Sequence, residues 1–318
     1  MNGLNDLSAQ KIRIGIALGE LLSEAGSPAE LLRVVDDCER WEIDSIWVSD
    51  RIAAPQPTPE PVVLLSFLAS RLKRMKLGTS ALVLPTRQPV TLAKELATLD
   101  LLSEGRLLLV AGLGADDSRD FEATGVPREE RGRRADEAIA LMKRLWTEEN
   151  VTFRGRFWST TGLTLVPRPY RREGIPLWTG GRSPAALRRA GRLADGWLAS
   201  RVTPREIEAG IQAIRVHAAA AGRCIPGDHY GALVPFCFAK SVAEASACAA
   251  QALRDRPDAA LGDYAALGPP ERVREKLEEY VRAGATKFVM RPAGPKGSAR
   301  DQIKTLAETI LPVLQTPA

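Results

Sequence analysis

Short apolar runs alternate along this chain with longer stretches in which apolar residues recur every three to four positions. The short runs predict eight strands, at Lys11–Leu18, Ser45–Ser49, Lys76–Leu84, Arg106–Ala111, Ile175–Thr179, Asp195–Ser200, Tyr230–Ala239 and Thr286–Arg291. The longer stretches predict helices, such as Pro89–Ser103 and Glu129–Trp146. Alternating strands and helices indicate a parallel α/β fold, and eight strands predict a (β/α)8 TIM barrel with insertion segments.

We expect residues 1–318 to form a single barrel domain, with 1–10 as a flexible N-terminal tail. A barrel of this kind needs roughly 250 residues, which leaves room for insertions. One insertion is predicted at Asn150–Pro169, where VTFRGRFWS places a glycine between aromatic-rich ends, as in a small β-hairpin. Near the end of the chain, Asp255–Gly268 is predicted as a long connection or broken helix and Ala299–Leu314 as one closing helix.

Composition narrows the class of protein. The chain is 45% hydrophobic and 26% charged, with a net charge of +5. Its charges are interspersed, as on solvated helix faces, so we expect no nucleic-acid binding.

The N-terminus lacks the pattern of a signal peptide and no apolar run approaches about 18 residues, so we expect a cytoplasmic protein without membrane contact. Four cysteines without CxxC spacing and two histidines encode no recognisable metal site or disulfide framework.

The stretch from Met75 to Asp117 contains two glycine-bearing features. Gly78–Ala81 interrupts an apolar strand with small residues, which often mark a bulge or the close approach of another group. Gly112, Leu113 and Gly114 close the next strand, where the backbone bends or approaches a ligand. Both features lie near the carboxyl ends of strands, where parallel barrels bind ligands. Simple tight turns are the alternative for either one.

Gly180, Gly181, Arg182 and Ser183 follow the strand Ile175–Thr179 and predict an anion cradle. Two glycines allow backbone N–H groups to converge, Ser183 can cap the following helix, and the helix dipole favours an anion there. Arg182 would add a charge-assisted contact or point to solvent. A plain turn between strand and helix is the alternative reading.

Asp50 and Arg51 end the strand Ser45–Ser49 and are candidate catalytic residues. An ion pair with a neighbouring loop explains this polar pair equally well.

Several other motifs are absent. Gly112-Leu113-Gly114 lacks the third glycine of a dinucleotide fingerprint, no GxxxxGK[ST] occurs, and the sequence around Ser183 departs from GxSxG at its last position. No pair of carboxylates has a spacing that singles out an acid and a base. If the chain is an enzyme, a cofactor therefore supplies the chemistry.

Three blocks point to a family: LVLPTRQPVTLAKELATLDLLSEGRLLLVAGLG, RGRRADEAIALMKRLWTEENVTFRGRFWS and PLWTGGRSPAALRRAGRLADGWL. In order and spacing, over most of the chain, they resemble the bacterial luciferase-like flavin or deazaflavin oxidoreductases. The resemblance implies a (β/α)8 barrel with insertions that binds FMN or the deazaflavin coenzyme F-420 at the carboxyl ends of its strands. A homodimer is expected from the family alone.

The segment GTSALVLP is most similar to the deazaflavin branch of that family. The resemblance implies a cis peptide bond between Ser80 and Ala81 that bulges behind the central ring of the cofactor. It further implies that the 112–114 and 180–183 loops hold the ribityl and phosphate part. Our leading hypothesis places Asp50 and Arg51 on the reacting side.

Two positions depart from the sugar-phosphate dehydrogenases of that branch. They have a histidine after the aspartate at the second strand end, where this chain has Arg51, and a glutamate after the GxG loop, where it has Ala115. We therefore expect hydride transfer between F-420 and an organic substrate other than a sugar phosphate.

Three alternatives stay open. The first is an FMN-dependent monooxygenase, and the second is a non-catalytic protein that binds or carries the cofactor. The third, a barrel aldolase or isomerase, needs a lysine or carboxylate at a strand end, and Lys287 near the start of the last strand is poorly placed for it.

Overall fold

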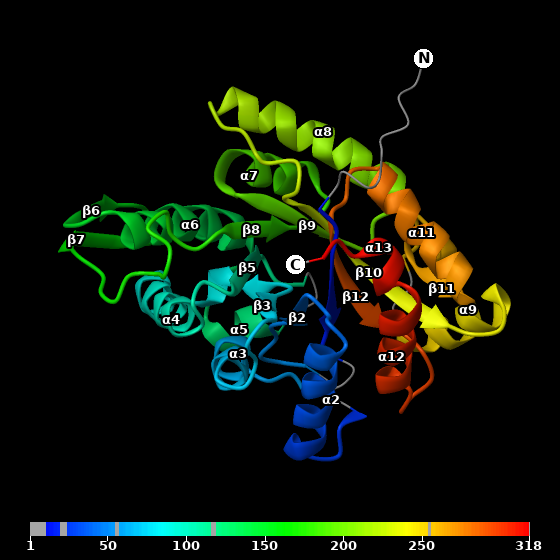
Figure 1. The fold of residues 1–318 in the computed structure, drawn as a ribbon. Coiled ribbons are helices and arrows are strands. Elements are labelled where there is room, and N and C mark those ends of the chain that lie inside the picture. Colours follow the sequence, from blue (N-terminus) through cyan, green and yellow to red (C-terminus); the bar gives the residue numbers. More distant parts are fainter. Residues whose placement is uncertain (1–10, 20–23, 55–56, 116–118, 254–255, 318) are drawn as a thin grey trace.

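The fold is a closed ring of eight parallel strands (Figure 1). The structure, a computed structural model, describes residues 11–19, 24–54, 57–115, 119–253 and 256–317. The ring contains β1 (Arg13–Ala17), β2 (Ser45–Val48), β3 (Lys76–Thr79), β5 (Leu107–Gly112), β8 (Leu177–Gly180), β9 (Gly196–Ser200), β10 (Tyr230–Phe238) and β12 (Lys287–Pro292). It closes because β10 pairs with both β9 and β12. The predicted (β/α)8 TIM barrel is confirmed, and each predicted strand has its counterpart.

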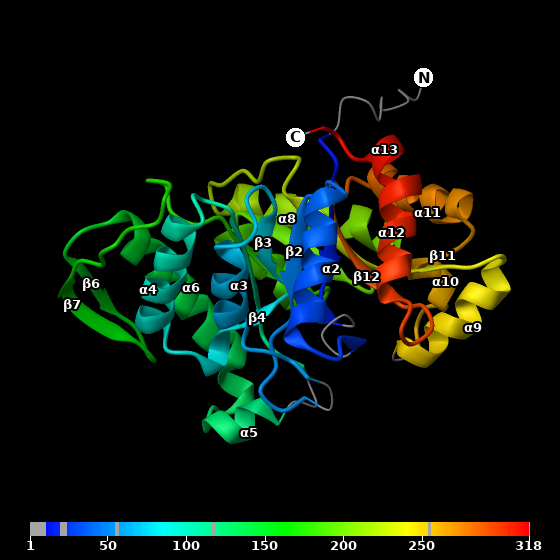
Figure 2. The same ribbon diagram turned by 60° about the horizontal axis from the view of Figure 1, so that its bottom comes forward.

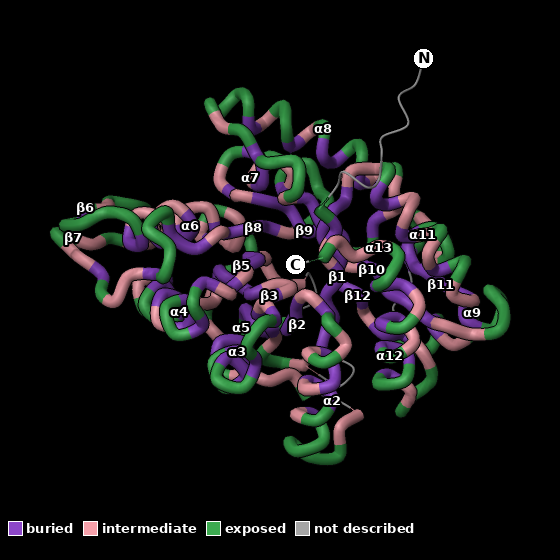
Figure 3. Tube along the Cα trace, in the orientation of Figure 1, coloured by how far each residue is buried: buried purple, intermediate pink, exposed green. Residues whose placement is uncertain are grey.

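Helices surround the ring, with their apolar faces toward the strands and their exposed faces outward (Figure 3). The longer ones are α2 (Pro28–Arg40), α3 (Pro61–Ala69), α4 (Pro89–Leu102), α6 (Arg131–Thr147), α7 (Pro184–Leu193), α8 (Pro204–Ala220), α9 (Val242–Ala252), α11 (Pro270–Arg282) and α12 (Ala299–Thr309). Several begin with a hydroxyl cap followed by proline, whose missing N–H costs nothing in the first turn. Thr203 is one such cap and forms a capping box with Glu206.

The predicted insertion is a two-stranded antiparallel hairpin of β6 (Val151–Arg154) and β7 (Ser159–Leu163). It lies at the outer edge of the molecule beside α4 and α6 (Figures 1 and 2). The Glu137 carboxylate on α6 accepts hydrogen bonds from the backbone N–H groups of Arg156, Phe157 and Trp158 at 2.6 to 3.2 Å. A single carboxylate thus holds the hairpin turn against the helix.

The predicted strand Lys76–Leu84 is wrong as a single strand. It divides into β3 and β4 (Leu82–Val83), followed by the 3-10 turn Leu84–Thr86. Pairing with β5 passes from Gly78↔Leu108 to Leu82↔Ala111, a step of four residues against three. The extra residue is a bulge, which agrees with the prediction from the small residues there.

Two further boundaries differ from prediction near the end of the chain. The closing helix is two helices, α12 and α13 (Leu311–Leu314), because Pro312 has no N–H to continue the first. The connection before α11 contains α10 (Leu261–Tyr264) and a short strand, β11 (Ala266–Gly268), which pairs with β10 outside the ring. Three strand residues are too few to show an alternating pattern.

Two tryptophans fill the inside of the barrel. Trp47 and Trp178 form an interior cluster with smaller side chains: Ala17, Val110, Leu198 and Val289. Glycines on neighbouring strands make room, since a Cβ atom on Gly78 would lie 2.3 Å from the Trp47 ring and one on Gly196 would lie 2.3 Å from the Trp178 ring. The barrel is therefore a packed core, and ligand sites lie at its two ends.

Candidate active site at the carboxyl ends of the strands

The bulge after β3 and the loop after β5 are in direct contact. The peptide bond between Ser80 and Ala81 is cis, as the family resemblance implied. A Cβ atom on Gly112 would lie 2.9 Å from the Cβ atom of Ala81, so only glycine lets the two segments meet. Gly114, at φ +76°, packs in the same way against Val83 and Phe121. The sequence had placed both features near the carboxyl ends of their strands, and the structure shows that they are in contact.

Asp50 lies behind this wall. Its side chain is buried, and Oδ2 accepts hydrogen bonds from the Val83 backbone N–H at 2.8 Å and from Arg87 Nη2 at 2.8 Å. Burial raises the pKa of Asp50, while the charge of Arg87 and the bond from Val83 oppose that rise. The ion pair with a neighbouring loop, one of the two predicted roles, is present. Asp50 thereby fixes the segment that follows the bulge.

Arg51 is half-buried beside Asp50. The chain just after it is held by Asp120, whose Oδ1 accepts hydrogen bonds from the N–H groups of Ile52 and Ala53 at 3.2 and 2.7 Å. Asp120 is buried at the start of α5 (Asp120–Thr124). Sequence analysis missed both Arg87 and Asp120, because each supports its loop from a distant part of the chain.

The loop after β8 presents free backbone donors. Ser183 caps α7, with its Oγ accepting a hydrogen bond from the Ala186 N–H at 3.2 Å. Trp197 Nε1 donates to the Gly181 carbonyl at 2.8 Å and so fixes the turn. Among the described residues, the N–H groups of Arg182, Ser183 and Ala185 donate no hydrogen bond. Donors of this kind at a helix N-terminus, together with the helix dipole, attract anions, so the geometry is compatible with the predicted cradle, which stays a prediction.

Arg182 does not point freely into this cradle. Its Nη1 lies 3.0 Å from Asp258 Oδ2 and 3.5 Å from Glu206 Oε1. Both carboxylates also bind the buried Arg256, whose hydrogen bond lowers the pKa of Glu206 to about 2. Arg256 is a further residue that sequence analysis missed, since nothing in its local pattern indicates burial.

These residues meet at one end of the barrel because parallel strands end on the same side. Contacts join Asp50, Ala81 and the 112–114 loop into one wall, while Gly180–Ser183 follows the adjacent strand, β8. A cavity of about 240 Å³ lies at the opposite, amino ends of the strands, among Lys76, Trp178 and Lys287. That cavity is separate from the predicted site.

The described residues include no cluster of metal-ligating side chains and no helix long and apolar enough to cross a membrane.

The carboxyl end of this closed parallel barrel thus combines a glycine-lined wall with a helix N-terminus whose N–H groups are not used within the described residues. Residues 13–255 match the family model of the luciferase-like monooxygenases. The chain belongs to this family, and the resemblance found in the sequence is confirmed.

Individual relatives and solved structures are similar to this chain in sequence or in fold. The chain is 31% identical over 204 residues to an F-420-dependent glucose-6-phosphate dehydrogenase of Kineococcus radiotolerans, covering 61% of this chain and 58% of that protein. The match thus spans little more than half the relative's length. The fold resembles monooxygenase RslO1 of Streptomyces bottropensis (TM-score 0.81, 22% identity, 95% of this chain and 99% of that one). It also resembles an F-420-dependent secondary alcohol dehydrogenase in complex with an F-420–acetone adduct (TM-score 0.80, 18% identity, 96% and 100%).

The residues present fit a phosphate-bearing cofactor at this end. Positions 112 and 180 expose backbone without a side chain, and the cradle offers three unused N–H donors. The expectation of an enzyme is confirmed at the level of the family.

Proposed function

We propose that this chain is an oxidoreductase that binds coenzyme F-420 at the carboxyl ends of its strands and transfers hydride between that cofactor and a small organic substrate. The cradle of free N–H groups at Arg182, Ser183 and Ala185 is the observation that supports this most directly. Curated relatives named as F-420-dependent dehydrogenases favour this cofactor.

Each part of the site has a proposed role. Bound F-420 would supply the hydride donor or acceptor. The 180–183 cradle would hold its phosphate, Gly112, Leu113 and Gly114 its ribityl chain, and the Ser80–Ala81 bulge would support the ring. Asp50 would keep that bulge in place through Val83 N–H. Arg51, half-buried at the end of β2, would face the substrate.

The substrate is proposed to differ from glucose 6-phosphate. Arg51 and Ala115 occupy the positions where the resemblance implies a histidine and a glutamate. At these two positions the chain therefore lacks the acid and base that the resemblance implies for oxidation of a sugar phosphate. Turnover of glucose 6-phosphate with bound F-420 would contradict this part of the proposal.

FMN is the second candidate cofactor. Asp258 and Glu206 form ion pairs with Arg182 and Arg256, so the Arg182 guanidinium beside the cradle is already engaged and adds little attraction for negative charge beyond the phosphate. FMN ends at its phosphate, whereas the tail of F-420 carries additional carboxylates.

Purified protein should be titrated with each cofactor while fluorescence is followed. Binding of neither at micromolar concentration would overturn the proposal, and a bound cofactor that no reductant reduces would favour a carrier.

A matched pair of variants tests the cradle. Gly181 has φ +95° and Gly222 has φ +67°, so both resist any side chain, but Gly222 lies in open space away from the cradle. Gly181→Val should weaken cofactor binding at least about tenfold, and Gly222→Val should not. Equal affinities of the two variants would place the phosphate elsewhere.

The expected homodimer is a separate prediction, which light scattering in solution would test.

A further inference from the structure

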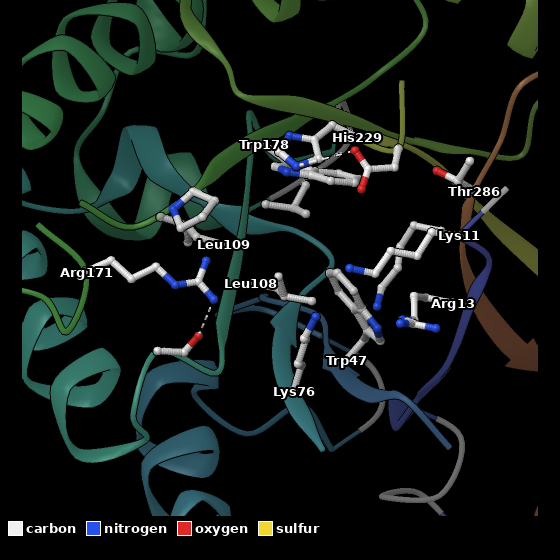
Figure 4. Close-up of a pocket in the computed structure, with 15 residues that line it drawn as sticks. Lys11, Arg13, Trp47, Lys76, Leu108, Leu109, Arg171, Trp178, His229 and Thr286 are labelled. Atoms are coloured by element: carbon white, nitrogen blue, oxygen red, sulfur yellow. Dashed lines mark hydrogen bonds and ion pairs between the residues drawn. The ribbon is translucent and has the colours of Figure 1, made fainter. Parts of the chain in front are cut away.

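The amino end of the barrel contains a cavity of about 240 Å³ with a basic lining (Figure 4). It lies at the opposite end from the cofactor site, at the starts of β1, β3, β5, β8, β10 and β12. Its floor is formed by the interior tryptophans Trp47 and Trp178, and the ring of His229 lies 5.5 Å from that of Trp178. The floor is therefore rigid and apolar, while the walls are charged.

Positive charge exceeds negative charge around this cavity. Five cationic side chains line it: Lys11, Arg13, Lys76, Arg171 and Lys287. Asp228 is the one carboxylate among the described lining residues, and Asp44 lies behind the wall. Asp44 is already engaged, because it forms ion pairs with Lys287 and, at 3.5 Å, with Arg13. The cavity therefore carries more positive charge than its own carboxylates can balance.

Lys76 shows the imbalance most clearly. Its ammonium group, at the start of β3, makes no hydrogen bond or ion pair within the described part of the chain. Burial lowers the pKa of Lys76, and the charges of Lys11, Arg13 and Arg171 lower it further against the pull of Asp44. Keeping several cations around one half-buried lysine costs free energy that an anion would offset.

The side chains converge from two sides. Figure 4 shows Lys11 and Lys76 directed into the cavity near Trp47, with Arg171 on the other side, beyond Leu108. Arg13 lies beside them, with its guanidinium held by Asp44 and by the Thr316 carbonyl. Arg171 donates to the Gly105 carbonyl at 3.2 Å, which fixes its guanidinium at the rim. Lysine and arginine donors around a small cavity suit a compact oxyanion with more than one negative charge.

We propose that this cavity is a binding site for a small multivalent oxyanion of the phosphate class, such as pyrophosphate or a small phosphate ester. The site is independent of the cofactor cradle, because Gly181 and Lys76 lie at opposite ends of the barrel. The bound anion neutralises the charges of Lys76 and Lys11 and links the starts of strands β1 and β3. Binding therefore stabilises the barrel increasingly as ligand concentration rises.

Pyrophosphate is a direct probe. Calorimetric titration and tryptophan fluorescence at constant ionic strength, with chloride as the balancing salt, should both show saturable binding, since Trp47 and Trp178 line the cavity. Lys76→Gln should weaken binding at least about tenfold. Lys304→Gln, on the exposed face of α12, is the matched control and should leave it unchanged.

Two further variants distinguish this cavity from the cofactor cradle as the place where the anion binds. Lys11→Gln changes an exposed lysine that precedes β1, so it tests the same site if Lys76→Gln fails to fold. Gly181→Val removes the cradle at the other end and should leave pyrophosphate binding intact. Absence of saturable binding would overturn the proposal, as would binding that survives both lysine variants. Binding lost in Gly181→Val would assign the anion to the cofactor site instead.

Discussion

A Cβ atom on Gly112 would lie 2.9 Å from the Cβ atom of Ala81. The backbone at the end of β5 thus packs so closely against the bulge after β3 that no side chain fits at position 112. Both residues are half-buried at the carboxyl end of the barrel, so a small displacement there would reach the ring side of the proposed cofactor site. The two glycine-bearing features of the central stretch therefore form one unit.

Gly112→Ala is expected to push this wall apart. One added methyl group in a packed contact should lower the free energy of unfolding by about 1–3 kcal/mol and weaken cofactor binding. Ala81→Gly in the same chain removes the opposing methyl group, so the double variant should recover most of both losses. Denaturant unfolding and cofactor titration measure them.

Gly227→Ala is the control for this pair, because a Cβ atom at Gly227 meets nothing within 4 Å. It should change neither quantity. If Ala81→Gly failed to restore binding in the presence of Gly112→Ala, the contact would not position the cofactor.

Asp50→Ala is expected to lower the free energy of unfolding by about 1–3 kcal/mol, because it leaves Val83 N–H and Arg87 without their shared acceptor. Cofactor affinity should fall with it, since the segment after the bulge loses its support. The control is Glu60→Gln, which removes the more exposed partner of Arg87 and should cost less than about 1 kcal/mol. Intact affinity in Asp50→Ala would show that this carboxylate does not position the wall.

Burial of Lys287 beside Asp44 predicts a rise in stability at alkaline pH. Burial lowers the pKa of Lys287 from 10.5 to about 8, although Asp44 opposes this. Between these two pH values the unfolded chain holds a proton that the folded chain has released, so the contribution of Lys287 to stability increases with pH. Asp44→Asn leaves the Lys287 ammonium group buried without its counter-charge, which should lower the free energy of unfolding by about 3–5 kcal/mol at pH 7. The loss should be smaller at pH 10, because the buried Lys287 is then neutral.

Urea unfolding at pH 7 and pH 10 measures this difference. Adding Lys287→Met to Asp44→Asn removes the unpaired cation and should recover most of the loss. A loss in Asp44→Asn that is as large at pH 10 as at pH 7 would contradict the role of the buried charge.

Glu137→Ala is expected to loosen the hairpin insertion without opening the barrel. It releases the three N–H groups of Arg156, Phe157 and Trp158, at a cost of about 1–3 kcal/mol to the local structure. Hydrogen exchange should accelerate at these amides and stay slow in the barrel strands. Glu275→Ala, which breaks an exposed pair with Arg272 on α11, should leave the hairpin unaffected; equal exchange in both variants would argue against this anchor.

Strand order and the positions of the turns could be predicted because local physics decides them. Apolar runs, helical periodicity and capped prolines at Pro28, Pro184 and Pro204 each act within a few residues. The single strand Lys76–Leu84 failed because a bulge depends on the register with β5, which no local pattern records. The very short strand β11 was missed because its pairing with β10 is likewise not recorded locally.

The chain alone therefore determined the (β/α)8 architecture, the family, and the loops at the carboxyl ends where a cofactor is proposed to bind. Only the tertiary structure decided which distant residues meet there: Arg87 with Asp50, Asp120 with the loop after Arg51, and Arg256 with Glu206. It also gathered Lys11, Lys76 and Lys287 around one cavity. Parallel strands bring equivalent positions to the same end of a barrel regardless of their separation in sequence, so charges that look scattered along the chain become neighbours in space.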